Sequence, residues 1–174
     1  PIIEEANVFA SNNIVEINFN KGVYSSPNGT GGISINDFNY IFQSNGGNCE
    51  SISVNNLTNE NGFNLVGGES TVYVQIESGN IASGSETIVF SPLNNFSIYD
   101  ENGNAMSTEN GTGLLYLRDL LPPSIDSYSL AADNSYIDLS FNDGIFGDSD
   151  ATDVIQSDDI DIELISNGSN VDSC

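Results

Sequence analysis

Residues 15–24 read VEINFNKGVY, and residues 137–146 read IDLSFNDGIF. In both stretches apolar and polar residues alternate, which is the period of a β-strand with one buried face. In the first stretch Val15, Ile17 and Phe19 form the apolar row, and chemically similar residues form a row 122 positions later. The sequence therefore predicts the same half-buried strand twice in one chain.

The correspondence continues on both sides of these strands, without a gap, between residues 1–52 and residues 123–174. Self-similarity at a fixed period indicates an array of repeats, and a period near 120 residues is the size of a domain. Leu121-Pro122-Pro123 marks the junction, where two prolines stiffen the linker. We expect residues 1–121 to form one complete repeat and residues 122–174 to form the first part of a second, incomplete copy. Identical positions include Asn12, Phe19, Asn20 and Asp37, which recur as Asn134, Phe141, Asn142 and Asp159.

Short alternating segments follow one another along the first repeat, and no helical period of useful length interrupts them. Asn-Gly pairs separate several of these segments, and Asn-Gly is a strong signal for a tight turn between strands. Further strands are predicted near residues 38–42, 52–54, 63–66, 71–76, 87–90, 96–99 and 114–118. This pattern predicts an all-β fold, an antiparallel β-sandwich with Greek-key connections.

The apolar rows also predict the core of the first repeat. We expect six side chains to lie inside it, namely Val15, Ile17, Phe19, Phe38, Tyr40 and Phe42. The second copy repeats the later row as Ile160, Ile162 and Leu164, but it has no second sheet to cover its strands. We therefore expect another chain to cover this open face by strand addition or exchange. Packing of neighbouring molecules without exchange is the simpler alternative.

Three segments carry a resemblance to a known family: VEINFNKGVY at residues 15–24, GSETIVFSPLNNFSIYDENGNAMS at residues 84–107 and LPPSI at residues 121–125. They resemble the tandem immunoglobulin-like repeats of large bacterial surface and secreted proteins, marine ones especially. The resemblance implies an immunoglobulin-like sandwich in a tandem array, and it carries an architecture rather than a chemistry. Such repeats often have an acid or a Ser-Glu pair where this chain has Asn20-Lys21, and Asp143 restores an acid in the second copy.

Charge limits the possible partners. The chain carries 25 acidic residues against two basic ones, a formal net charge of −23. Nucleic-acid binding needs clustered basic residues, and anionic lipid would repel this chain. We therefore expect no nucleic acid as a partner. Because no apolar run reaches the length of a membrane span, we also expect no direct insertion into a membrane. A saline or calcium-rich medium would screen the self-repulsion, so we expect an extracellular or cell-surface location.

Catalytic groups are scarce. The chain has no histidine, the usual acid–base group near neutral pH, and no tryptophan, a common platform for sugars. The acidic residues fit the polar faces of strands or turns, so the chain is predicted not to be an enzyme. Cys49 and Cys174 occupy nearly equivalent places in successive copies, too far apart for a disulfide. We expect free thiols or bonds to other chains.

One cofactor is predicted, a calcium ion bound by the second copy. Counted from Asp148, side-chain oxygens fall at positions 1, 3, 5, 9 and 12, as in a twelve-residue calcium loop, and the Val154 carbonyl falls at position 7. A cation would also offset the repulsion among closely spaced acids. The candidate ligands are Asp143, Asp148, Asp150, Thr152, Asp153, Gln156, Asp158 and Asp159. The alternative is a solvated acidic loop.

Together these patterns predict a non-catalytic spacer repeat of an extracellular bacterial adhesin or surface fibre. Independent domains on short stiff linkers add length, and each buries its own core. The expected partners are further copies of the repeat, in the same or another chain. Two alternatives stay open: a subunit of a polymeric filament completed by strand exchange between chains, and an accessory module of a secreted hydrolase.

Overall fold

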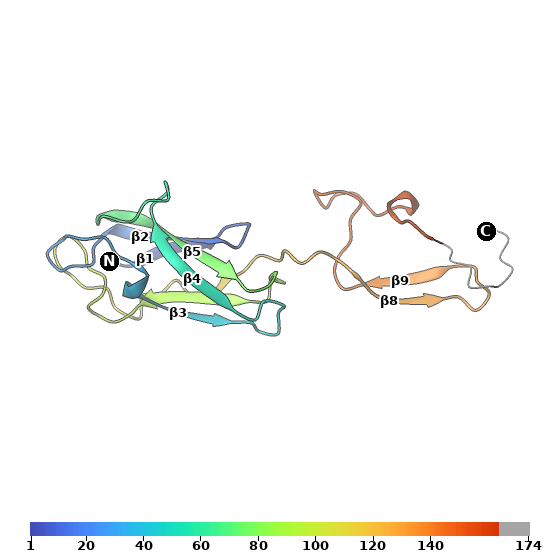
Figure 1. The fold of residues 1–174 in the computed structure, drawn as a ribbon, viewed down its shortest axis with the longest axis horizontal. Coiled ribbons are helices and arrows are strands. Elements are labelled where there is room, and N and C mark those ends of the chain that lie inside the picture. Colours follow the sequence, from blue (N-terminus) through green and yellow to red (C-terminus); the bar gives the residue numbers. More distant parts are fainter. Residues whose placement is uncertain (164–174) are drawn as a thin grey trace. The chain divides into compact units, whose positions relative to one another are not determined.

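The computed structural model describes residues 1–163, and the chain divides after Leu121 into two compact units (Figure 1). The described residues form antiparallel β-strands and two short 3₁₀ turns, without an α-helix. The all-β, antiparallel character predicted from the alternation is therefore confirmed. Within residues 1–163, no helix is long and apolar enough to cross a membrane.

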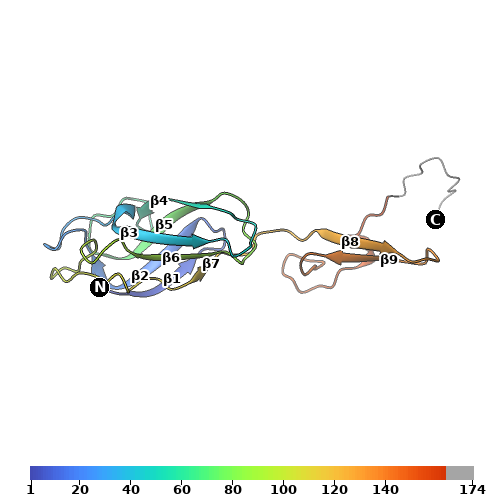
Figure 2. The same ribbon diagram turned by 90° about the horizontal axis from the view of Figure 1, so that it is seen from below.

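The first unit consists of two antiparallel sheets (Figures 1 and 2). The larger sheet has the order β1-β2-β5-β4, with β1 at Ile3–Val8, β2 at Ile14–Val23, β5 at Glu69–Ser78 and β4 at Ile52–Thr58. The smaller sheet has the order β3-β6-β7, with β3 at Phe38–Gln43, β6 at Thr87–Pro92 and β7 at Leu115–Tyr116. A 3₁₀ turn, η1 at Ile35–Asp37, precedes β3.

One apolar core joins the two sheets. Val15, Ile17 and Phe19 are buried along β2, alternating with more exposed polar residues as the sequence predicts. Ile88 and Phe90 of the smaller sheet belong to the same buried cluster. Two antiparallel sheets that share a core form a sandwich-like arrangement, in which each sheet buries the apolar face of the other.

The second predicted row lies less deeply than expected. Phe38 is buried and stacks edge-on against Phe90, but Phe42 is only partly buried. Tyr40 is 39% exposed, so the prediction that it lies inside was wrong. The reason is the position of β3 at the edge of the smaller sheet, where Tyr40 contacts the Phe90 ring while its other side meets solvent.

Two predicted strands are also absent. Residues 63–66 form a turn region joined to β4 only through the bridge between Thr58 and Asn64. The Glu69 carboxylate accepts the N–H groups of Val66 and Gly67, each at 2.8 Å, so a side chain takes donors that a neighbouring strand would otherwise use. These donors therefore stabilise a loop rather than a sheet.

Residues 96–99 deviate for a similar reason. Phe96 donates its N–H to Asn94 Oδ1 at 2.8 Å, and the Ser97 hydroxyl donates to the Asn94 carbonyl. This side-chain-capped turn leaves only Tyr99 to form isolated bridges, with Tyr24 and with Ala105.

The hairpins that begin the two units share their loop geometry, 122 residues apart. In the second unit the hairpin joins β8 (Ile125–Leu130) to β9 (Ile137–Phe141). Asn12 adopts φ 54° and Asn134 adopts φ 59°, a left-handed conformation that asparagine tolerates better than most residues. The hydrogen bond from Phe9 N–H to the Ile14 carbonyl has its counterpart between Ala131 and Tyr136.

The open ends of the hairpins correspond as well. In the first unit Ile2 N–H donates to Asn20 Oδ1 at 3.0 Å, and Asn20 N–H donates to the Ile2 carbonyl at 3.1 Å. In the second unit Ser124 and Asn142 make the same two bonds, at 2.6 and 3.1 Å. The local sequence therefore encodes the hairpin in both places.

Farther along the second unit the 3₁₀ turn η2 (Ser157–Asp159) is the counterpart of η1, but no strand follows it within residues 160–163. Ile160 is half-buried and Ile162 is exposed, so these two residues do not form the predicted inward row. In the first unit β3 is held by β6, and residues 122–163 include no equivalent of β6. Leu164 and Cys174 lie outside the described residues.

We predict that Phe19→Ala lowers the free energy of unfolding of the first unit by about 3–5 kcal/mol, because truncation leaves a cavity in a close-packed core. Phe141→Ala is the matched control, since Phe141 is only partly buried on a two-stranded sheet, and it should cost much less. Denaturant unfolding of the full chain measures both. Equal losses in the two variants would contradict the assignment of the core.

Candidate functional site

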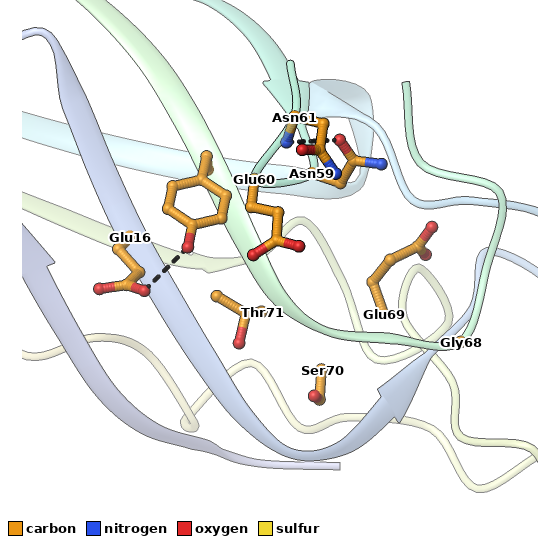
Figure 3. Close-up of a pocket in the computed structure, with 9 residues that line it drawn as sticks. Glu16, Asn59, Glu60, Asn61, Gly68, Glu69, Ser70 and Thr71 are labelled. Atoms are coloured by element: carbon orange, nitrogen blue, oxygen red, sulfur yellow. Dashed lines mark hydrogen bonds between the residues drawn. The ribbon is translucent and has the colours of Figure 1, made fainter. Parts of the chain in front are cut away.

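A hollow of about 440 Å³ lies on the first unit beside β2 and β5 (Figure 3). Its lining is polar and includes three glutamates, Glu16, Glu60 and Glu69, together with Tyr73. The antiparallel register of β2 and β5 sets Glu16 opposite Tyr73, and the tyrosine hydroxyl donates to Glu16 Oε1 at 3.1 Å. Three carboxylates thus lie around one surface depression of the first unit.

Several polar groups of this hollow already have hydrogen-bond partners. Burial raises the pKa of Tyr73, and the hydrogen bond from Tyr73 to Glu16 and the charges of Glu16 and Glu60 raise it further. The phenol therefore remains a protonated donor at neutral pH rather than a base or nucleophile. Glu69 turns back to accept two backbone N–H groups of its own loop. Two of the three carboxylates thus serve the structure, whereas glycoside cleavage would need a pair free to act.

Sequence reasoning did not find this hollow. Glu16 and Tyr73 are far apart along the chain, and only the pairing of β2 with β5 brings them together. The available signal was weak: both residues occupy the polar side of an alternating strand, but alternation does not reveal which strands are neighbours.

Outside the hollow, the carboxylate of Glu86 is fully buried and holds two segments together. Its oxygens accept the N–H of Cys49 at 2.7 Å, the N–H of Ser83 at 3.0 Å and the Ser83 hydroxyl at 3.3 Å. Burial alone would raise the pKa of Glu86, but these hydrogen bonds outweigh it and hold the pKa below its usual value. Glu86 therefore stays ionised and joins the turn before Cys49 to the segment before β6. Cys49 itself is buried and free.

The carboxylate of Asp100 is 1% exposed and organises the turn that follows it. It accepts both the side-chain amide and the backbone N–H of Asn104, the latter at 2.9 Å, and the N–H of Asn102 at 3.0 Å. Lys21 Nζ adds an ion pair at 3.2 Å. The Asn104 hydrogen bonds, with smaller contributions from Lys21 and Asn102, hold the pKa of Asp100 well below its usual value. The Lys21 side chain is thus a structural partner of Asp100.

The predicted calcium loop lies on the second unit between β9 and η2. Asp148 accepts the N–H groups of Thr152 at 2.8 Å and of Asp153 at 3.1 Å, and also the Thr152 hydroxyl. These bonds, the Thr152 hydroxyl first, lower the pKa of Asp148. Asp159 accepts Gln156 N–H at 2.9 Å as part of η2. The loop therefore uses two of its predicted ligands, Asp148 and Asp159, to hold its own backbone.

The remaining candidate ligands are dispersed around this loop. Asp143 accepts the N–H of the neighbouring Gly144, and the other acids of the set are exposed, namely Asp150, Asp153 and Asp158. Among residues 1–163, no three acidic or cysteine side chains lie close enough together to hold a metal ion. The candidate ligands therefore do not form a coordination set in this arrangement, and calcium binding stays a prediction from the sequence.

Comparison of the chain with protein-family models, with curated proteins and with solved structures gives no match.

We predict that Asp100→Asn destabilises the first unit at neutral pH and that this effect fades in acid. A carboxyl whose pKa is lowered by folding stabilises the fold above its unfolded pKa, whose usual value is 3.8, and this contribution is lost as the pH falls through the folded pKa. The difference between the denaturation midpoints of the wild type and Asp100→Asn should therefore shrink below about pH 4. Glu101→Gln, at an exposed neighbour, should show no such difference. A constant difference from pH 7 to pH 2 would contradict the prediction.

We also predict that calcium binds the second unit in preference to the first, because the negative charge is denser in the loop after β9. Calorimetric titration of the full chain should detect this binding, and the paired substitutions Asp148→Asn and Asp150→Asn should abolish it. Asp37→Asn is the matched control, since Asp37 is the counterpart of Asp159 in the first unit. Equal binding in all variants, or none in the wild type, would contradict the calcium site.

Proposed function

We propose that the chain is part of a tandem array of immunoglobulin-like repeats that acts as a spacer in an extracellular adhesin or surface fibre. The observation that carries the proposal is the agreement between the two hairpins. Their loops, their reciprocal Asn20 and Asn142 bonds and their 3₁₀ turns recur at one offset of 122 residues. Local structure repeated at a domain-sized period supports modules in series.

The interior of the first unit supports a structural role. Within the described residues, every buried side-chain nitrogen or oxygen has a hydrogen-bond partner. Glu86 and Asp100 are the buried acids, and both hold turns through backbone or amide donors. A catalytic site usually has a strained or unsatisfied polar group that can act on the substrate. The carboxylates of Glu86 and Asp100 instead bind donors of the fold itself.

The net charge supports an extracellular location, and the prolines at the junction support an array of separate units. The net charge of −23 favours a saline exterior, where salt screens repulsion between successive repeats. Pro122 and Pro123 remove two backbone donors at the junction, which disfavours a continuous strand running from one unit into the next. Further copies of the repeat are the proposed partners, and the array would provide reach for an adhesive part elsewhere.

A filament subunit completed by strand exchange is the second candidate. One observation favours it: several apolar side chains of β8 and β9 are exposed within the second unit. In that case the partner copy would come from another chain rather than from the same chain.

The spacer proposal predicts a discrete mechanical unit. When the full chain is stretched from its ends, the first unit should open in one event that lengthens the chain by roughly 400 Å, since about 120 residues extend by about 3.3–3.6 Å each. Phe19→Ala should lower the force of this event without changing the increment. Gradual extension without a peak would contradict a load-bearing spacer. Retention of the chain on a polysaccharide matrix would favour the accessory module of a hydrolase instead.

A further inference from the structure

The apolar side of the β8–β9 hairpin is open to solvent, although its counterpart in the first unit is closed. Val8 is 6% exposed and Val15 is 0% exposed, whereas their counterparts Leu130 and Ile137 are 58% and 50% exposed. Since the hairpin hydrogen bonds agree, this contrast comes from what lies beside the hairpin rather than from the hairpin itself. Within the described part of the second unit, residues 122–163, the hairpin therefore presents a formed but uncovered core face.

The first unit provides the template for the missing cover. There β5 pairs with the outer edge of β2, setting Val74 opposite Val15 and Val72 opposite Ile17. The sheet β3-β6-β7 supplies the other wall of the core. In residues 122–163 the sheet contains β8 and β9 alone, so the edge of β9 that corresponds to the β5 side of β2 has no strand beside it.

In the first unit the covering half is also held near its C-terminal end, by a polar contact with the hairpin loop. The Asn12 side chain makes a reciprocal pair with the backbone of Arg118: Asn12 Nδ2 donates to the Arg118 carbonyl and Arg118 N–H donates to Asn12 Oδ1, both at 2.7 Å. Asn12 is buried by this contact at 3% exposure. The equivalent position of the second unit is also an asparagine, Asn134, and it has the same left-handed φ. Its side chain could therefore bind an equivalent backbone segment in the same way.

We propose that the open face of β8–β9 binds the second half of a repeat, a chain segment with the pattern of residues 53–121. Its β5 equivalent pairs with β9, and Asn134 holds the backbone that corresponds to Arg118. This inference rests on the proposed array of repeats, because an array supplies such a segment. The occupant is thus a half-repeat, and the recognised features are an alternating apolar strand and a backbone clamp.

Charge argues against the simplest other occupant, a second copy of the same open face. Residues 122–163 carry eleven acidic residues and no basic one. Two such units placed face to face would bring two dense negative surfaces together, which low-salt solution penalises. The segment 53–121 carries eight acidic residues and Arg118 over a greater length, so its charge density is lower.

One position shows that the natural occupant differs from residues 53–121 in detail. A Cβ placed on Gly32 would lie 2.0 Å from the Leu65 carbonyl oxygen, so the loop before β5 requires glycine there. The second copy has Val154 at the equivalent position. The occupant of the second unit therefore has a different loop before its β5 equivalent, and Val154→Gly should improve the fit of residues 53–121.

The test is a fusion in which residues 53–121 follow Cys174 directly, since Cys174 is the counterpart of Ile52. Amide hydrogen exchange, read at the β9 amides that do not bond to β8, compares the fusion with the unmodified chain in high salt. We expect exchange at these amides to slow at least 100-fold in the fusion carrying Val154→Gly, and to a smaller extent in the fusion without it.

Two variants separate docking from simple tethering. In the first variant, aspartate replaces the appended copies of Val72 and Val74. It should abolish the protection, because these two positions would lie opposite the apolar residues of β9. Asn134→Gly keeps the left-handed backbone but removes the amide, and it should reduce protection in the fusion while leaving the unmodified chain unchanged.

The proposal is overturned if β9 stays unprotected in both fusions, or if the valine-to-aspartate fusion is protected equally well. It is also overturned if protection in the unmodified chain rises with protein concentration, because the occupant would then be a second copy of the open unit. None of these results affects the stretching experiment, which depends on the first unit alone.

Discussion

The first unit depends on one constraint, the burial of the inward row of β2. Val15, Ile17 and Phe19 need cover both at the strand edge, which β5 provides, and on the face, which the smaller sheet provides. A β-hairpin alone cannot provide either, because its two strands leave one whole face in water. The comparison of the two units makes this visible within one chain: the same hairpin is buried where its cover is present and exposed where residues 122–163 supply none.

The scarcity of basic residues shapes how the buried acids are stabilised. With one lysine and one arginine in 174 residues, ion pairs cannot serve 25 acids. Asp100 has Lys21 as a partner, but Asn104 contributes more to its ionised state, and Glu86 relies on N–H and hydroxyl donors alone. Hydrogen bonds from neutral donors are screened by salt less than exposed ion pairs are, so both buried acids stay ionised in a chain that has few basic residues.

Local patterns predicted most strands of the first unit, but they do not reveal which strands are neighbours in a sheet. Alternation located β2, β5 and β6 because the apolar–polar period of a strand depends only on the residues of that strand. It could not reveal that β3 lies at an edge, which is why Tyr40 was placed too deep. Nor could it show that Glu69 and Asn94 divert backbone donors from two expected strands. The hollow beside Tyr73 escaped prediction for the same reason, since it depends on pairing across sequence-distant strands.

The calcium loop shows the limit of spacing as evidence. Its ligand positions were counted along the chain, but the carboxylate at the first position accepts donors from Thr152 and Asp153, as loop-closing aspartates do. The second copy also departs from the first where glycine gives way to a side chain, as Val154 replaces Gly32. A Cβ at Gly32 would meet the Leu65 backbone in the first unit, so the cover that we propose for the second unit would need a different loop at this point. In the array that we propose, successive repeats would therefore keep the hairpin, while the loop that faces this position would differ from one repeat to the next.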